Sequence, residues 1–151
     1  MFSFLTLAAR MTESNEPIQK ALLDEQLTKY WQGWGRAGDL GVVACRELDD
    51  LPVSCAWVRQ LPATDKSYLG DGILELAFGT IASERGHGIG TATLTALIEE
   101  CRVARASGIS LSARADNPAL RLYRRLGFET LSLIENRVGT QSFVMKLDLG
   151  K

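Results

Sequence analysis

The residues that most constrain the fold form a strand-like run, a glycine loop and a helix-like run in direct succession. An apolar, mostly β-forming run over residues 73–78 precedes the loop, and a helix-like run over 91–106 follows it at once. The loop carries three alternate glycines, Gly86, Gly88 and Gly90. Glycines let a ligand approach the backbone, and the first turn of a helix offers unpaired N–H groups at the positive end of its dipole. This order predicts a site for a phosphate-bearing ligand.

Two common phosphate-binding loops do not fit the spacing of these glycines. A P-loop requires Gly-Lys-Ser/Thr at the helix start, whereas Gly90 is followed by Thr91. A dinucleotide fingerprint that starts at Gly86 requires glycine or alanine at position 91 and an acidic residue about 20 residues later, where Ser110 is found instead. The remaining Arg-x-x-Gly-x-Gly pattern over 85–90 does not identify the ligand by itself.

The composition predicts one domain without a strong electrostatic field. The chain has 151 residues, of which 46% are hydrophobic, and its 17 Lys and Arg against 18 Asp and Glu give a net charge of −1. A chain of this length can build one core, so we expect a single domain over 1–151. The small net charge provides no basic field for nucleic acid or anionic membranes, so we expect a small-molecule partner and neither of those.

The N-terminus and the cysteines favour a cytoplasmic protein. The apolar run over 2–8 has no basic region before it and soon meets Arg10, so it predicts a β-strand rather than a signal peptide, and no stretch is long enough to span a bilayer. Cys45, Cys55 and Cys101 are odd in number and lack metal-ligand spacing, so we expect no metal site. A symmetric hairpin turn would place Cys45 opposite Cys55, yet we expect thiols in this compartment.

The rest of the chain alternates helix and strand signals. Apolar residues recur at helical spacing over 13–34, and the aromatic residues Tyr30, Trp31 and Trp34 either cover the core or border a substrate mouth. A strand over 109–113 follows the helix and should therefore run parallel to the strand over 72–80. The remaining predicted elements are a hairpin of 40–46 and 53–60, a loop over 61–72, a helix over 119–126 with Asn117 as its cap, and an antiparallel pair of 128–134 and 141–147.

Two segments together resemble the signature motifs of one family. Arg85-Gly86-His87-Gly88-Ile89-Gly90 before a helix resembles the acyl-CoA pyrophosphate loop of the GNAT acyltransferase superfamily. About thirty residues later, residues 117–128 read Asn-Pro-Ala-Leu-Arg-Leu-Tyr-Arg-Arg-Leu-Gly-Phe and resemble its second signature, Asn-Pro-Ala-x-x-Leu-Tyr-x-x-Leu-Gly-Phe. The motif match covers roughly 74–128. One departure is Ala82, where the family often has proline, which should affect the rigidity of the loop more than the chemistry.

The resemblance implies a fold and a cosubstrate. The expected fold is mixed α/β, with a central mixed sheet whose two parallel strands splay apart and are flanked by helices. The expected cosubstrate is acetyl-CoA, whose pantetheine arm would pair with separated strands that otherwise leave backbone groups unpaired. The residues implied in binding it are Phe78, Gly79 and Thr80 for pantetheine, Arg85, Gly86, His87, Gly88, Ile89, Gly90 and Thr91 for the phosphates, and Asn117 for the coenzyme arm.

The resemblance also implies transfer of an acetyl group to a primary amine by direct attack in a ternary complex. At pH 7 the neutral form of a lysine-like amine costs about 4.6 kcal/mol and that of an α-amine about 1.4 kcal/mol, so a general base matters more for the first. Glu75 is the candidate base, directly or through water, and its alternative is a solvent-facing strand residue. Tyr123 is the candidate proton donor to the thiolate, and its alternative is packing between helix and sheet.

The acceptor remains open at this stage. It is expected to be a small-molecule or peptide amine, bordered by the first helices and by the loop over 134–141, and similar proteins often form homodimers. Two other functions fit the same motifs, namely transfer of a longer acyl group and a non-catalytic acyl-CoA sensor or interaction domain. Release of free CoA in the presence of amines would separate an enzyme from a sensor.

Overall fold

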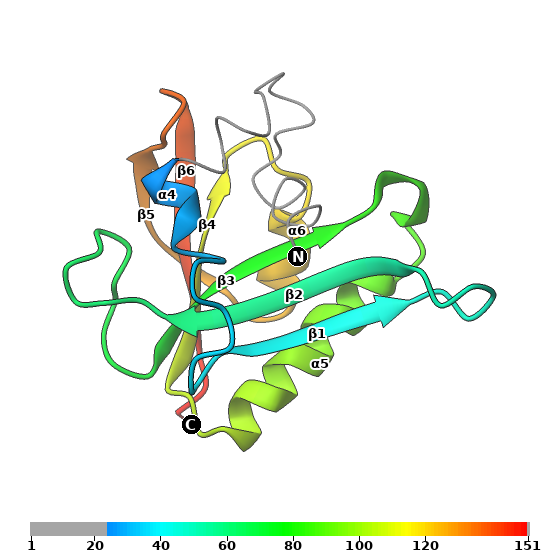
Figure 1. Cartoon of the computed structure of the whole chain (residues 1–151). Coiled ribbons are helices and arrows are strands. Elements are labelled where there is room, and N and C mark those ends of the chain that lie inside the picture. The colour runs from blue at the N-terminus through cyan, green and yellow to red at the C-terminus, as the bar shows by residue number, and fades with distance from the viewer. Residues whose placement is uncertain (1–23, 151) are drawn as a thin grey trace.

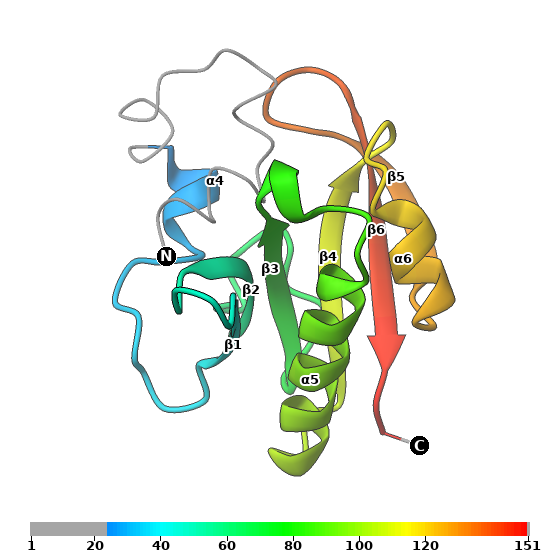
Figure 2. The same ribbon diagram turned by 90° about the vertical axis from the view of Figure 1, so that its right-hand side faces the viewer.

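The computed structural model describes residues 24–150, which build a six-stranded mixed sheet with the strand order β1-β2-β3-β4-β6-β5. Helices α5 and α6 cover one face of the sheet, and α4 lies on the other (Figures 1 and 2). The strands are β1 (Leu40–Cys45), β2 (Pro52–Gln60), β3 (Ile73–Thr80), β4 (Gly108–Arg114), β5 (Glu129–Glu135) and β6 (Gln141–Asp148). The helices are α4 (Glu25–Thr28), α5 (Ile89–Val103) and α6 (Leu120–Arg125), with a 3₁₀ turn, η1, at Ala82–Glu84.

The centre of the sheet is a parallel pair that separates part way along its length. Strands β3 and β4 pair only from Ile73 and Gly108 to Glu75 and Ser110. Beyond that point β3 stays paired with β2 as far as Thr80, while β4 stays paired with β6. The two ribbons diverge visibly in Figure 1. The expected mixed α/β fold with splayed parallel strands is therefore confirmed.

The main core lies between the sheet and the face covered by α5 and α6. Helix α5 repeats apolar residues every three or four positions, and one face of it is therefore buried. Leu94 and Leu97 on this face pack with Leu76 of β3, Leu111 of β4 and Met145 of β6 in one cluster. Tyr123 of α6 joins the same cluster, which fixes α6 close to the ends of the diverging strands.

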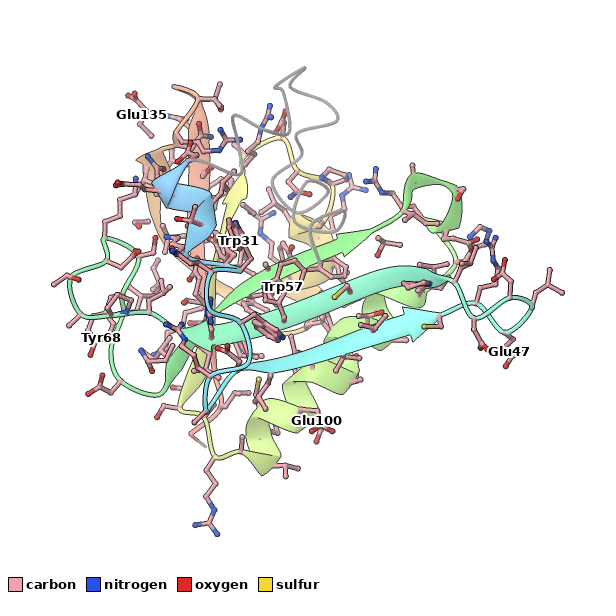
Figure 3. All side chains as sticks on the ribbon, viewed as in Figure 1. Trp31, Glu47, Trp57, Tyr68, Glu100 and Glu135 are labelled. Atoms are coloured by element: carbon pink, nitrogen blue, oxygen red, sulfur yellow. The ribbon has the colours of Figure 1, made fainter. Side chains whose placement is uncertain are left out.

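The opposite face carries a smaller core, made largely of aromatic residues. Trp57 of β2 is 1% exposed and forms a cluster against which Tyr30 and Trp31 pack. Figure 3 labels Trp57 and Trp31 on this face. The indole Nε1 of Trp57 donates to the backbone oxygen of Tyr30 at 2.8 Å. Because no large helix covers this face in the described part of the chain, the short segment after α4 takes that place.

Arg59 of β2 ties this short segment to the sheet. Its Nη2 atom lies 2.7 Å from Asp39 Oδ2, and both side chains are almost fully buried. The same guanidinium donates to the backbone oxygens of Lys29, Gln32 and Gly33 at 2.7–3.4 Å. A buried guanidinium needs such partners, because its charge is costly to remove from water. These acceptors therefore replace the hydrogen bonds that water would otherwise make to Arg59.

Most predicted elements occur within one to three residues of their expected bounds, but two expectations are wrong. Cys45 faces Pro52 rather than Cys55, because the register of β1 shifts between Ala44 and Cys45, and all three cysteines are free. Residues 13–23 of the helix predicted over 13–34 lie outside the described residues. In the described part, α4 ends at Thr28 and turns follow as far as Gly35, so the helix prediction is wrong for 29–34; Gly33 and Gly35 both have positive φ. The strand predicted over 2–8 lies outside the described residues.

Neither a membrane span nor a metal cluster occurs in the part of the chain that the structure describes. Its longest helix, α5, has 15 residues, and no helix there is long and apolar enough to cross a bilayer. Within the same residues no group of three or more His, Cys, Asp or Glu side chains is arranged to hold a metal ion.

Candidate active site

A cavity of about 160 Å³ occupies the gap between the diverging strands. One of its sides is formed by Leu76–Phe78 of β3, by β4 beyond Ser110, and by Asn117 and Tyr123. The other side is formed by α4 and Tyr30, by Lys66 and Ser67 of the loop over 61–72, and by the turn between β5 and β6. The predicted loop over 134–141 therefore does border the cavity, and so does Tyr30. Trp31 and Trp34 are not among the described residues that border it.

The glycine loop presents a row of backbone donors beyond the end of β3. None of the predicted residues over 79–91 borders the cavity itself, which Phe78 reaches instead. Gly86 and Gly88 have φ values of 80° and 79°, a conformation that glycine adopts without steric cost. Ala92 is the first residue of α5 whose amide reaches back to the preceding turn, bonding the oxygen of Gly88 at 3.0 Å. Within residues 24–150 the amides over 86–91 have no acceptor. They stand at the positive end of a 15-residue helix and are suited to bind an anion.

Gly90, the third glycine of the loop, leaves no room for a side chain. A Cβ atom at this position would lie 3.0 Å from Cζ of Phe78 and 3.4 Å from Oγ1 of Thr80. The first turn of α5 therefore rests directly on the end of β3. This contact brings the open amides of the loop to the mouth of the gap between β3 and β4.

The polar side chains of the loop are held mainly by nearby groups. Arg85 Nε donates to the oxygen of Thr80 at 3.2 Å, which leaves the exposed guanidinium end beside the loop. His87 is exposed, and its Nδ1 lies 3.3 Å from the oxygen of Glu84. Thr91 Oγ1 accepts from Arg125 of α6 at 3.1 Å. The last contact joins the start of α5 to the end of α6.

The backbone of β3 over residues 78–80 has one free edge. Phe78, Gly79 and Thr80 are paired with Ala56, Cys55 and Ser54 of β2 on one side. On the other side the pairing with β4 has already ended at Glu75, and no other described strand takes its place. This edge faces the gap and can pair with an extended ligand that carries amide groups.

Tyr123 reaches the cavity from α6 and is 6% exposed. Its ring packs edge-to-face against Phe78 at 6.3 Å and against Phe128 at 5.7 Å between centroids. Burial raises the pKa of this phenol well above its ordinary value of 10, so it stays protonated at neutral pH. Its hydroxyl makes no hydrogen bond to any residue over 24–150. The side chain therefore both packs between helix and sheet and offers a donor to the cavity.

Asn117 borders the cavity but does not cap α6 in the predicted way. Its Oδ1 accepts from the amide of Ala119 at 2.9 Å, which closes a tight turn around Pro118. The helix begins at Leu120, one residue later than predicted, and its N-cap position is Ala119. The turn that Asn117 closes still leaves its side chain beside the ends of β4 and α6.

Glu75 lies in the interior and not at the surface. It is 2% exposed, and its two carboxylate oxygens accept from Tyr30 Oη at 3.0 Å and from Ser110 Oγ at 2.7 Å. Burial raises the pKa of this carboxyl, and the hydrogen bond from Ser110 partly opposes that shift. The solvent-facing alternative is therefore wrong. Glu75 is also not among the residues that border the cavity, whereas Tyr30 is.

Sequence reasoning missed Ser110 and Arg59. Ser110 carries no signal, because a serine in an apolar strand is common and its contact with Glu75 spans 35 residues. Arg59 carries a weak one, because it is a charged residue that ends an apolar run, 53–58, in a predicted strand. A buried charge of this kind indicates a partner elsewhere in the chain, although not which one.

The fold is that of solved acetyltransferases. A ribosomal-protein-alanine N-acetyltransferase from Brucella melitensis aligns with a TM-score of 0.70 and 24% identity over 99% of this chain and 96% of that one. A phosphinothricin acetyltransferase from Sinorhizobium meliloti, in complex with AcCoA, aligns with a TM-score of 0.60 and 24% identity over 73% of this chain, which spans 60% of that protein. The ribosomal-protein-S18-alanine N-acetyltransferase from Escherichia coli aligns with a TM-score of 0.60 and 19% identity over 76% of this chain and 72% of that one.

The sequence agrees with the fold. The model of the acetyltransferase (GNAT) family matches residues 7–128, so the chain belongs to this family of acyl-transferring enzymes. No curated protein sequence matches the chain. The resemblance of the two motifs is therefore confirmed at the level of the family.

Proposed function

We propose that the protein is an acetyl-CoA-dependent N-acetyltransferase that transfers the acetyl group to a primary amine by direct attack in a ternary complex. One observation carries this proposal: the pairing of β3 and β4 stops at Glu75, and a cavity opens between the strands. Phe78 at the wall of this cavity is also the residue on which the start of α5, with its open amides, rests. A strand edge, an anion site and a protonated phenol thus meet at one gap. These are the groups that a pantetheine arm, a diphosphate and a departing thiolate require.

The glycine-loop side of the cavity holds the coenzyme in this proposal. The diphosphate accepts from amides over 86–91, and Arg85 and His87 lie where they add charge or hydrogen bonds to the phosphates. The pantetheine amides pair with the free edge of residues 78–80, and Asn117 contacts the same arm. This assignment is supported because the edge of β3 over 78–80 and the amides over 86–91 have no hydrogen-bond partner within the described chain and can therefore bind the coenzyme.

Tyr123 is the proposed proton donor. The amine nitrogen attacks the thioester carbonyl carbon, the C–S bond breaks, and the sulfur takes the phenol proton. A phenol that stays protonated at neutral pH and has no competing acceptor in the described chain is suited to this step. Glu75 is the proposed base, acting indirectly because it does not border the cavity.

The proposed acceptor is an amine on a small molecule or a peptide. The solved relatives include enzymes whose names specify phosphinothricin and the alanine of a ribosomal protein, which are acceptors of both kinds. Cytoplasmic location belongs to the same proposal, as does a homodimer.

Two measurements on the purified chain test the function. Calorimetry with CoA and acetyl-CoA should give saturable binding, and a panel of α-amines and lysine-like amines should release free CoA from acetyl-CoA in a protein-dependent way. Binding without turnover on any amine would favour a sensor. Faster turnover of longer acyl-CoA esters than of acetyl-CoA would show that the enzyme transfers a longer acyl group. Absence of heat at millimolar concentrations would contradict the whole proposal.

A further inference from the structure

Glu75 and Tyr30 form a hydrogen-bonded pair in which only the tyrosine reaches the cavity. Tyr30 Oη donates to Glu75 Oε1 at 3.0 Å, and the other carboxylate oxygen is taken by Ser110 at 2.7 Å. Tyr30 borders the cavity, while Glu75 lies behind it. A proton that leaves a molecule in the cavity for Glu75 therefore has to pass through an intervening group, and Tyr30 already has the required hydrogen bond.

We propose that Tyr30 is a catalytic residue that relays a proton from the acceptor amine to Glu75; this rests on the proposed acetyltransferase function. As the nitrogen bonds the acetyl carbon, its proton passes to Tyr30 Oη while the phenol proton passes to Glu75 Oε1. The C–S bond breaks, and the sulfur takes the proton of Tyr123. Solvent then removes the proton from Glu75 and restores that of Tyr123. The amine has exchanged one hydrogen for an acetyl group, and the sulfur has become a thiol.

The electrostatics of the pair suit a relay better than a stable phenolate. Burial and the neighbouring Glu75 both raise the pKa of the Tyr30 phenol well above its ordinary value. Tyr30 can therefore accept a proton only while it gives its own away. Burial also raises the pKa of Glu75, which makes the carboxylate a stronger base than one in water. Three charged groups of the described residues lie near the pair. Lys29 Nζ is 5.4 Å from the Tyr30 ring centroid, Asp65 binds Lys29 at 3.2 Å, and the buried Arg59 lies opposite Glu75 in the register of β2 and β3.

The backbone around Tyr30 is fixed from the sheet below it. Trp57 Nε1 donates to the oxygen of Tyr30, and Arg59 Nη1 donates to the oxygens of Lys29 and Gln32 at 3.1 and 2.7 Å. A short segment after a one-turn helix would otherwise have few contacts to hold a side chain in place. These bonds keep the phenol oriented toward Glu75, as a proton relay requires.

The first experiment compares Tyr30→Phe with Tyr68→Phe. Both variants remove one hydroxyl that donates to a carboxylate, since Tyr68 Oη donates to Asp71 at 2.7 Å. Tyr68, labelled in Figure 3, is not among the residues that border the cavity, although Lys66 and Ser67 of the same loop are. We expect Tyr30→Phe to lower kcat about 10²-fold, the usual scale for general acid–base catalysis, with the Kd and stoichiometry of acetyl-CoA binding unchanged. Tyr68→Phe should retain the kcat of the unmodified enzyme. The acidic limb of the kcat profile set by Glu75 should disappear in Tyr30→Phe.

The second experiment combines Tyr30→Phe with Glu75→Gln. Residues that act as one unit give non-additive losses, so the double variant should have nearly the same kcat as Glu75→Gln alone. Multiplied losses would show two independent roles and would overturn the relay.

The controls separate failure of the relay from failure of the function. Absence of turnover by the unmodified enzyme would contradict the acetyltransferase proposal and the relay with it. Normal turnover combined with a Tyr30→Phe kcat within twofold of Tyr68→Phe would overturn the relay alone. A loss of kcat that matches a loss of acetyl-CoA binding stoichiometry would show a structural role for Tyr30 and would also overturn it.

Discussion

The two sides of the cavity are built from different parts of the polypeptide. The side proposed for the coenzyme, called the coenzyme side, is formed by the end of β3 and Tyr123 of α6, with the loop over 85–91 beyond them, and it relies on backbone groups that glycines leave accessible. The side proposed for the acceptor, called the acceptor side, is formed by α4 with Tyr30, by Lys66 and Ser67, and by the β5–β6 turn, and it relies on side chains of connecting segments. Backbone geometry binds the same ligand whatever the neighbouring side chains are. Side chains on connecting segments can change without loss of the fold, so we expect this side to select the acceptor.

The largest expected effect tests the foundation of the acceptor side. Arg59→Met leaves Asp39 buried without its charge partner, so we expect the free energy of unfolding to fall by about 3–5 kcal/mol. Urea unfolding measures this loss. The double variant Arg59→Met with Asp39→Leu should recover much of it. If the folded fraction binds acetyl-CoA normally but its KM for the amine rises, the two sides are separable. Equal losses in the affinity for acetyl-CoA and for the amine would contradict the distinction between the two sides.

The next effect tests the coenzyme side through Tyr123. Tyr123→Phe keeps the ring contacts with Phe78 and Phe128 and removes only the hydroxyl. We expect kcat to fall about 10²-fold, or about 2.7 kcal/mol of transition-state stabilisation, while the Kd for acetyl-CoA stays within twofold. Rates of CoA release and calorimetry provide both values. Unchanged turnover would remove Tyr123 from the mechanism and leave it a packing residue.

A smaller effect tests the contact between α5 and β3. Gly90→Ala introduces a Cβ at 3.0 Å from Phe78, so the start of α5 has to shift, at a cost of about 1–3 kcal/mol for overpacking. Because the open amides move with it, acetyl-CoA should bind more weakly while the acceptor side stays intact. Gly150→Ala, where the nearest atom would be 3.5 Å away, is the matched control. Equal affinity of both variants would show that the amides do not need this contact.

The smallest effect concerns the pH dependence of stability. The pKa of Glu75 is raised in the folded protein above its ordinary value of 4.5, so the folded state prefers the protonated form. The resulting stability is present at pH values below 4.5 and is lost as the pH rises through the folded pKa. Glu75→Gln should therefore make the melting temperature less dependent on pH on the acidic side of neutrality. Glu129→Gln, on the exposed strand β5, is the control, and identical profiles for both variants would contradict the shift.

The sequence predicted the glycine loop, the helix after it and the parallel strands well because their requirements are local. Gly86, Gly88 and Gly90 are needed by the loop itself and by its contact with β3, and a strand separated from the next one by a helix has to run parallel to it. The register of the hairpin between β1 and β2 was predicted wrongly for the opposite reason, because it is not fixed locally. The irregularity between Ala44 and Cys45 depends on the packing of the sheet, and no residue type marks it.

The acceptor side depended on contacts between residues far apart in the chain. Tyr30 and Glu75 are 45 residues apart, and Ser110 is 35 residues beyond Glu75. An alternating Leu-Glu-Leu pattern is compatible with a solvent-facing glutamate until a segment from elsewhere covers it. Only the tertiary structure brought that segment to the sheet.

The sequence by itself determined the class of fold, the position of the glycine loop and the identity of Tyr123 as a candidate, because each follows from backbone conformation or from a short motif. The tertiary structure alone decided that Glu75 is buried, that Tyr30 stands between it and the cavity, and that Arg59 holds the covering segment. The physical reason is that burial and hydrogen-bond pairing of charged groups are properties of a packed arrangement, and local sequence does not specify which distant residues will complete it.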